Sequence, residues 1–402
     1  MIQLKKKRKK KKLTSHSQKK RIKNSFPKNR YINPKKNKMT NQPNTSKMEY
    51  RYLGNTGLRV SVLGWGSMMM GTDTEENNKN AIKTLISHGI NFFDSAEIYD
   101  LGKCEIALGK AIKELNIPRE KIVVTTKIFR NGNDPNDSFL SRKHIIEGLN
   151  QSLKRLQMDY VDVIYCHRPD KNTPVEEICR AMNYVIENGK AFYWGTSEWD
   201  ADQIMLAYKI CEKLNLMRPI VEQTQYNLLH RERIEREYAN LFKNFKLGIT
   251  VWSPLFSGAL TGKYLNSIPD DSRYSKHKEL NGYGLDYYFK NKKIIDEKIE
   301  KLKVIAERKL NCTLAQMSIA WIIANQDIST VILGSTKISQ VEEIIPAIDI
   351  YKKMTKEIMK EIEEILNNAP IGPWDYESFK LLRNRRNELL DVDYLRMPDF
   401  VK

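Results

Sequence analysis

Four polar side chains of the kinds used in acid–base chemistry follow short apolar runs of this chain. Asp94 ends one such run, and Tyr99 comes five residues later. Lys127 directly follows the next run, and His167 stands two residues after the run beyond it. If these runs are parallel strands of one sheet, their carboxyl ends meet at one edge, where catalytic groups gather. Each residue alone has a simpler explanation, such as a turn cap, a packed ring or a solvated charge, but their joint placement favours a catalytic site.

A carboxylate, a phenol, an ammonium and an imidazole together suit the reduction of a carbonyl group. Reduction leaves negative charge on the carbonyl oxygen, which then needs a proton. A phenol is a weak acid, with a pKa of about 10 in water, and a buried cation beside it stabilises its ionised form. We therefore expect Tyr99 to donate the proton, Lys127 to be the cation and Asp94 to pair with Lys127 in a dry site. His167 is expected to donate a hydrogen bond to the developing oxyanion and to orient the substrate.

The elements that must position these side chains alternate along the chain. Eight short runs rich in Val, Ile and aromatic residues predict strands. They cover residues 62–66, 91–94, 122–126, 161–165, 192–196, 220–224, 249–252 and 330–333. Amphipathic segments of helical length separate most of them, such as 78–88, 142–156, 174–187 and 200–214. Eight such units predict the α/β class and a closed parallel (β/α)8 barrel, the TIM barrel.

Helix start signals and one missing motif support this fold. Ser141 and Thr313 precede helical segments as N-caps, and Thr173 precedes Pro174 at the start of another. A doubly wound sheet would require a Gly-x-Gly-x-x-Gly turn after the first strand. Residues 64–71 are glycine-rich but lack that spacing. The long connection over 255–311 predicts an insertion that covers a ligand at the catalytic face.

The positive charge of the chain is concentrated at its N-terminus. The net charge is +19, yet residues 1–47 hold 18 of the 68 Lys and Arg and no acidic residue, which leaves 50 basic and 49 acidic residues elsewhere. We expect a disordered tail over 1–47, a barrel over 48–370 and a C-terminal extension of unassigned role over 371–402. Within that extension, residues 376–390 could form one more amphipathic helix. Only the tail has a composition suited to polyanions.

The tail leaves several interpretations open. The clusters 4–12 and 18–23 suit a nuclear address, an RNA-binding arm or a membrane-surface anchor. A solvated flexible tail, or a true start at Met39 or Met48, explains them more simply and is the favoured interpretation. Five scattered Cys without a CxxC pair favour reduced thiols, and argue against a disulfide framework or a metal site. Without a signal-like segment or a run of about 20 apolar residues, a cytoplasmic location is expected.

Three stretches around the four polar residues resemble the aldo-keto reductase superfamily. Residues 89–99 resemble its signature around the catalytic Asp and Tyr, 125–129 carry the Lys, and 152–170 resemble the signature that ends at the catalytic His. Further runs at 140–148, 180–186, 193–199 and 252–255 resemble the branch of voltage-gated potassium-channel β subunits. The likeness covers about residues 50–370. It is closest to the plant form, because His167 and Glu198 stand where the animal form has Asn and Arg.

The resemblance implies an NADP(H) cofactor that lies across the barrel rim. Gln223 and Trp252 would hold and stack on the nicotinamide, and Ser197 would bond its amide. Cations at Lys263 and Arg273 would contact the 2′-phosphate, which NAD lacks. The remaining cofactor residues that the resemblance implies are Ser67, Ser253, Pro254, Leu255, Ser257, Gly334, Thr336, Gln340 and Glu343. Met68 replaces a family Trp, which alters the substrate pocket, and Ile344 replaces an Asn near the adenine.

Two functions follow from the resemblance and are compatible. One is an enzyme that reduces a small aldehyde or ketone. The other is an accessory subunit, assembled as a homotetramer, that couples the redox state of NADP(H) to the gating of a potassium channel. Such a partner would bring the chain to the periphery of a membrane.

Overall fold

The fold is seen in a computed structural model that describes residues 47–270, 272, 275, 285–334 and 338–371. All but one residue of the predicted tail, all but one residue of the predicted C-terminal extension and the whole helix expected over 376–390 lie outside the described residues.

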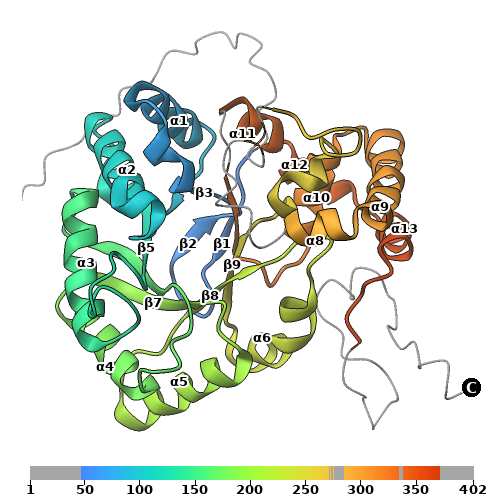
Figure 1. Cartoon of the computed structure of the whole chain (residues 1–402). Coiled ribbons are helices and arrows are strands. Elements are labelled where there is room, and N and C mark those ends of the chain that lie inside the picture. The colour runs from blue at the N-terminus through green and yellow to red at the C-terminus, as the bar shows by residue number, and fades with distance from the viewer. Residues whose placement is uncertain (1–46, 271, 273–274, 276–284, 335–337, 372–402) are drawn as a thin grey trace, which may run out of the picture. The chain divides into compact units, whose positions relative to one another are not determined.

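Eight parallel strands form a closed barrel, in the order β10-β3-β4-β5-β6-β7-β8-β9 (Figure 1). Their bounds are β3 (Leu63–Gly66), β4 (Phe92–Asp94), β5 (Val123–Ile128), β6 (Val161–Cys166), β7 (Ala191–Ser197), β8 (Val221–Gln225), β9 (Gly248–Trp252) and β10 (Thr330–Leu333). The ring closes where Val331 of β10 pairs with Leu63 of β3. The predicted (β/α)8 barrel is therefore confirmed.

Helices surround the barrel (Figure 1). They are α1 (Glu75–Ser87), α2 (Lys103–Glu114), α3 (Arg142–Leu156), α4 (Val175–Glu187), α5 (Ala201–Leu214), α6 (Ala239–Phe245), α8 (Leu285–Lys290), α9 (Lys292–Ile305), α10 (Leu314–Ile323), α11 (Ile338–Ile344), α12 (Ala347–Ile350) and α13 (Lys356–Leu366). Ser141 caps α3 and Thr313 caps α10 through their side chains, as predicted. The expected cap at Thr173 was wrong, because its hydroxyl donates to Asp170 and Pro174 occupies the N-cap of α4.

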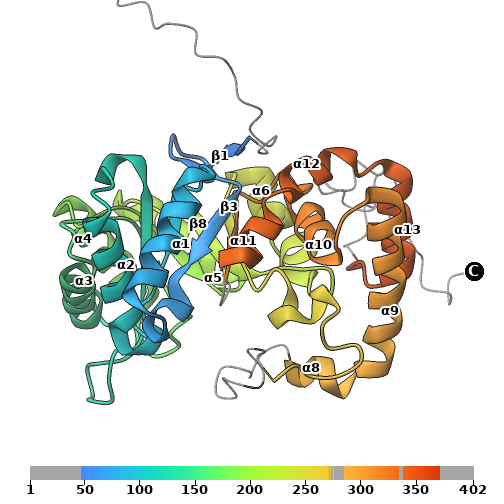
Figure 2. The ribbon, with the colours of Figure 1, turned by 90° about the horizontal axis from the view of Figure 1, so that it is seen from above.

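A two-stranded antiparallel hairpin, which the sequence pattern did not predict, precedes the barrel. It consists of β1 (Tyr50–Tyr52) and β2 (Arg59–Ser61), and Figure 2 shows it at the opposite end of the barrel from α8. Its turn contains Gly54 at φ 61°, where a Cβ would lie 2.5 Å from the carbonyl oxygen of Ile220 and 2.6 Å from the amide nitrogen of Gly248. Only glycine permits this approach. The hairpin therefore packs on the residue before β8 and the first residue of β9, at the amino end of the barrel.

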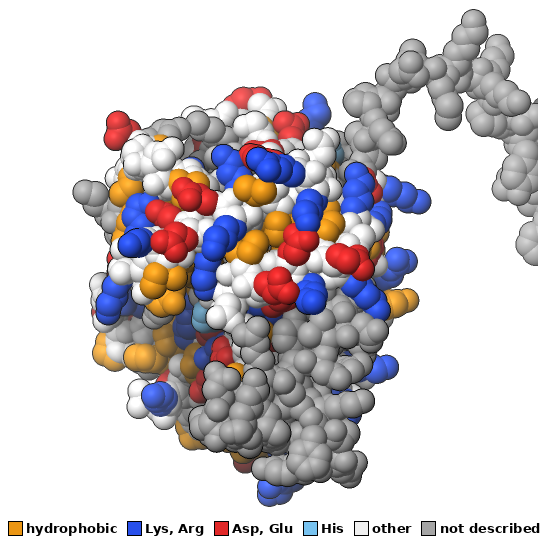
Figure 3. Space-filling model, turned by 90° about the vertical axis from the view of Figure 1, so that its right-hand side faces the viewer, with side chains coloured by type: hydrophobic (Ala, Val, Ile, Leu, Met, Phe, Trp, Pro, Cys, Tyr) orange, Lys and Arg blue, Asp and Glu red, His pale blue; other side chains and the backbone are white. Residues whose placement is uncertain are grey.

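Side chains alternate between the inside of the barrel and the surrounding helices. The interior cluster contains Leu53 of the hairpin turn together with Phe92, Val123, Val163 and Val221 of four strands. The larger cluster fills the space between strands and helices. On the side of α9 and α13, Figure 3 shows Lys and Arg interspersed with Asp and Glu, which agrees with the near-neutral charge outside the tail.

Candidate active site

The Lys127 ammonium lies at the centre of the predicted site. Its Nζ is 2.5 Å from Asp94 Oδ2, 2.8 Å from the carbonyl oxygen of Ser95 and 3.1 Å from Tyr99 Oη. Lys127 is completely buried, so these three acceptors match its three N–H donors in place of water. Burial alone would lower the pKa of Lys127, but the neighbouring Asp94 and Tyr99 outweigh it and raise that pKa above its ordinary value. The ammonium is therefore a permanent cation beside the phenol.

The Asp94 carboxylate is fixed from two sides of the barrel. Its Oδ1 accepts a hydrogen bond from Thr125 Oγ1 at 2.7 Å and another from Gln223 Nε2 at 3.2 Å. Thr125 belongs to the neighbouring strand β5, whereas Gln223 reaches across from β8. Because the other oxygen binds Lys127, both carboxylate oxygens have fixed partners.

Tyr99 lies in the loop after β4. Its amide donates to the carbonyl oxygen of Ala96 at 3.1 Å. The two residues that follow, Asp100 and Leu101, have left-handed backbones with φ of 47° and 50°. Such conformations are unfavourable for non-glycine residues and cluster at functional sites. The loop thus turns sharply just after it has placed the phenol beside Lys127.

His167 completes the group from the end of β6. Its amide donates to the carbonyl oxygen of Ile128 at 3.0 Å, and its ring meets that of Tyr99 edge-on, with centroids 5.7 Å apart. Burial, together with the positive charges of Lys127 and Arg168, holds the pKa of His167 well below its usual value. The imidazole is therefore neutral near pH 7. The four predicted side chains come together at the carboxyl ends of β4, β5 and β6.

The predicted nicotinamide contacts lie on the same rim. The Ser197 hydroxyl accepts a hydrogen bond from Arg168 Nη1 at 3.2 Å, and Trp252 Nε1 donates to Glu198 Oε1 at 2.7 Å. The Arg168 guanidinium also donates to the carbonyl oxygen of His167 and lies 6.0 Å from the centre of the Trp252 ring. Neither a role for Arg168 nor the contact between Glu198 and Trp252 is predicted from the sequence. The one local signal in the sequence is the position of Arg168, directly after His167.

The loop after β9 provides a cradle suited to phosphate groups. Ser253, Phe256 and Ser257 all have left-handed backbones, with φ of 51°, 48° and 54°, while Pro254 is buried and Leu255 half-buried. Gly258 follows at φ 92°, and a Cβ there would lie 2.7 Å from Lys263 Nζ. The ammonium thus approaches a loop with two serine hydroxyls, an arrangement with the donors that a phosphate group takes in proteins.

The remaining predicted cofactor residues are placed as follows. The Ser67 hydroxyl is buried and donates to Ser95 Oγ at 2.8 Å, directly beside the Lys127 contacts. Gly334 follows β10, is exposed, and has open space where a Cβ would stand. Gln340 and Glu343 are exposed on α11. Arg273 and Thr336 lie outside the described residues.

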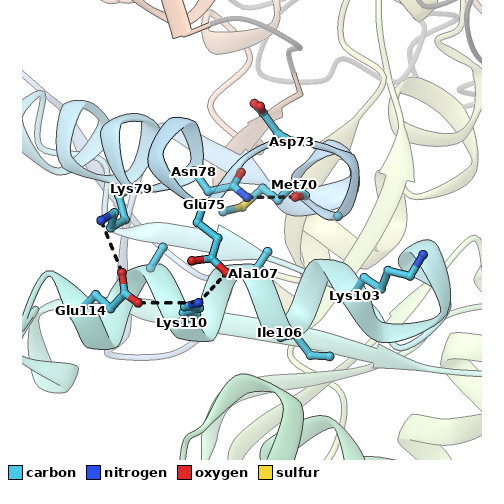
Figure 4. A pocket seen from close by; sticks show the side chains of 12 residues that line it. Met70, Asp73, Glu75, Asn78, Lys79, Lys103, Ile106, Ala107, Lys110 and Glu114 are labelled. Atoms are coloured by element: carbon cyan, nitrogen blue, oxygen red, sulfur yellow. Dashed lines mark hydrogen bonds and ion pairs between the residues drawn. The ribbon is translucent and has the colours of Figure 1, made fainter.

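A groove of about 260 Å³ between α1 and α2 is separate from this rim (Figure 4). Lys110 Nζ lies 2.5 Å from Glu75 Oε1 and 3.9 Å from Glu114 Oε1, and Lys79 Nζ lies 3.5 Å from Glu114 Oε2. Its charges are therefore largely neutralised within the groove. None of the four predicted catalytic residues, Asp94, Tyr99, Lys127 and His167, lines this groove.

Over the described residues, no helix is both long and apolar enough to cross a membrane. Within the same residues, no three His, Cys, Asp or Glu side chains form a group that could hold a metal ion.

Comparison with known proteins assigns the family. Residues 62–367 match the model of the aldo/keto reductase family. A relative from Arabidopsis thaliana, named as a probable voltage-gated potassium channel subunit beta, is 46% identical over 335 residues, which cover 82% of this chain and 100% of the relative. A relative of the same name from Oryza sativa subsp. japonica is 46% identical over 329 residues, or 80% of this chain and 98% of the relative. The chain therefore belongs to the aldo/keto reductase family.

Proposed function

We propose that this protein reduces small aldehydes or ketones to alcohols with NADPH, and that Tyr99 donates the proton. One observation carries the proposal: the buried Lys127 ammonium contacts both the Asp94 carboxylate and the Tyr99 phenol. A cation held in this way stabilises the phenolate that remains after proton donation. Membership of the aldo/keto reductase family supports the same chemistry.

Each side chain of the group has a separate task in this mechanism. Tyr99 Oη gives its proton to the carbonyl oxygen, and Lys127 balances the charge left on the phenol. Asp94 keeps Lys127 in place and offsets the cost of its burial. His167, neutral because of burial and neighbouring cations, donates a second hydrogen bond to the carbonyl oxygen and orients the substrate. When bound, the reduced nicotinamide supplies the hydride.

The rim residues support NADP(H) as the cofactor. Trp252 offers an indole whose nitrogen is tied to Glu198, and Ser197 offers a hydroxyl at the end of β7. The strained loop 253–258 and the Lys263 ammonium suit phosphate groups. A cation at this position favours the extra 2′-phosphate of NADP(H) over NAD(H). Arg273 is proposed as the second cation on the basis of the resemblance alone.

The substitution Tyr99→Phe tests the proton donor. It removes one hydroxyl and retains the ring, so NADPH binding, followed by cofactor fluorescence, should stay within about twofold of the parent. Turnover of an aldehyde such as 4-nitrobenzaldehyde should fall by about 10²- to 10⁴-fold, the usual contribution of a general acid. A variant that reduces the aldehyde as fast as the parent would show that Tyr99 is not the donor.

A second candidate function is that of an accessory subunit of a voltage-gated potassium channel. The specific observation in its favour is that both similar plant proteins carry the name of such subunits and are matched over nearly their whole length. In this role a homotetramer would bind the channel on its cytoplasmic side and respond to the redox state of NADP(H). Co-purification of the tagged chain with a channel from its own cells would support this role, and its absence from such complexes would count against it.

A further inference from the structure

Glu97 is a buried carboxylate in the same loop as Tyr99, two residues before it, and the mechanism above does not use it. The side chain is completely buried. Its Oε1 accepts a hydrogen bond from the amide of Phe129 at 2.6 Å and lies 3.0 Å from His144 Nε2. Because an ionised carboxylate only accepts hydrogen bonds, the imidazole is the donor in the second contact. Three segments therefore meet at one oxygen atom: the loop after β4, the end of β5 and the first turn of α3.

We propose that Glu97 is a positioning residue for Tyr99, and that His144 holds Glu97 in its working orientation. The inference rests on the proposed role of Tyr99 as the proton donor. The backbone supports the connection: the amide of Glu97 donates to the carbonyl oxygen of Lys127 at 3.2 Å, and the amide of Tyr99 donates to Ala96. The loop that carries the phenol is thus fastened to the end of β5 just after the Lys127 side chain, at the carbonyl oxygen of Lys127 and the amide of Phe129.

The close packing around Glu97 points to a specific requirement for a carboxylate. Its second oxygen, Oε2, has no hydrogen-bond partner among the described residues. A Cβ at Gly148 of α3 would lie 3.0 Å from that oxygen, so a glycine leaves room for it. Burying a half-satisfied carboxylate lowers stability, which is an unfavourable choice for a purely structural contact. The cost is understandable if the carboxylate sets the separation of the Tyr99 phenol from Lys127.

Two groups of side chains therefore have different roles in this site. Lys127 and Asp94 act on the phenol directly, whereas Glu97 and His144 fix the loop that delivers it. A shift of the reacting group by about 1 Å costs about a hundredfold in rate. Loss of the Glu97 contacts should therefore lower kcat and leave the binding of cofactor and substrate nearly unchanged.

The test compares Glu97→Gln with Asp162→Asn. Asp162 is a suitable control because it is also a buried carboxylate that accepts a backbone amide of β5, at 2.8 Å from Val124 near the other end of that strand. Glu97→Gln keeps an acceptor oxygen but removes its charge, which weakens both hydrogen bonds. It should lower kcat about ten- to hundredfold, with KM and the Kd of NADPH within about twofold of the parent. The ionisable side chains beside the Tyr99 phenol are Lys127 and His167. Because the phenol of the variant lies farther from the Lys127 ammonium, the alkaline limb of the kcat profile should move to higher pH. Asp162→Asn should lose stability but retain kcat and its pH profile.

Substitutions of His144 provide an independent test of the positioning role. His144→Leu removes the donor and should lower kcat in the same way, while His144→Gln restores an N–H donor of similar reach and should recover most of the turnover. This pair decides the matter if Glu97→Gln does not fold. Parental kcat in Glu97→Gln or in His144→Leu would overturn the inference, as would an equal loss of kcat in Asp162→Asn.

Tyr99→Phe distinguishes a failure of the positioning role of Glu97 from a failure of the proposed proton donor. If that variant is inactive but the Glu97 and His144 variants behave like the parent, only the positioning role fails. If Tyr99→Phe retains turnover, the proposed proton donor itself is wrong, whatever the other variants do.

Discussion

At the scale of single residues, the sequence predicts which side chains meet at the site but not all of the hydrogen bonds between them. Asp94, Tyr99 and Lys127 were predicted to be neighbours because parallel strands end at one rim, and the atoms do lie within hydrogen-bonding distance. The bond between Asp94 and Gln223 spans the barrel from β4 to β8. No local spacing encodes it, because it depends on the curvature that closes the sheet. The same holds for the contact of Glu198 with Trp252.

Lys263 offers a test of cofactor preference at the residue scale. Its ammonium is held against Gly258 in the strained loop, and a charge-assisted contact with a phosphate is worth about 1.5–3 kcal/mol. Lys263→Met should raise the Kd of NADPH at least about tenfold and leave the Kd of NADH nearly unchanged, in fluorescence titrations. Lys309→Met, which removes a surface ammonium paired with Glu361, is the control. Equal weakening of both cofactors would argue against a contact with the 2′-phosphate.

Among the elements, strand interiors were easier to predict than strand ends. The strand expected at residues 330–333 is observed with those bounds, whereas the third strand continues through Lys127 to Ile128. A charged residue ordinarily marks the end of a buried strand, but Lys127 pairs with Tyr165 of β6 in the sheet register. Partners from β4 and the loop after it satisfy its ammonium, so tertiary structure overrides the local signal. The hairpin of β1 and β2 was missed because its strands are only three residues long.

Arg231 connects the β8 side of the barrel to the last described helix, α13. Its guanidinium is almost fully buried and lies 2.6 Å from Glu235 Oε2 and 2.6 Å from Glu363 Oε2. Arg231→Met takes the cation from two buried carboxylates, so the free energy of unfolding should fall by about 3–5 kcal/mol, as measured with urea. Arg236→Met removes an exposed pair with Glu232 and should cost less than about 1 kcal/mol. Similar small losses in both variants would mean that Arg231 does not hold α13.

At the scale of the whole molecule, the charge distribution separates the tail from the barrel. The barrel was predictable because eight repeats of one simple unit leave a strong periodic signal. The tail has no such pattern, and its composition admits several roles without selecting one. Its boundary near residue 47 remains a prediction.

Deletion of residues 1–47 tests that boundary. Because the proposed catalytic and cofactor residues all lie beyond it, the shortened chain should reduce the aldehyde at the rate of the full chain, in steady-state assays. Binding to a polyanion such as heparin should become much weaker and lose most of its salt dependence, since 18 Lys and Arg are removed. A large drop in turnover would place part of the folded body within the deleted segment.

The pairing of β10 with β3 has a consequence for synthesis on the ribosome. The two strands that complete the ring come from opposite ends of the barrel sequence, so the first must wait until nearly all of the chain has emerged. Contacts between such distant segments form slowly, because a long loop must be closed before any pairing compensates. A nascent chain halted before residue 330 would expose the unpaired edges of β3 and β9, and unpaired edges invite aggregation. The period between the emergence of β9 and that of β10 is therefore the part of translation in which chaperones have most to protect.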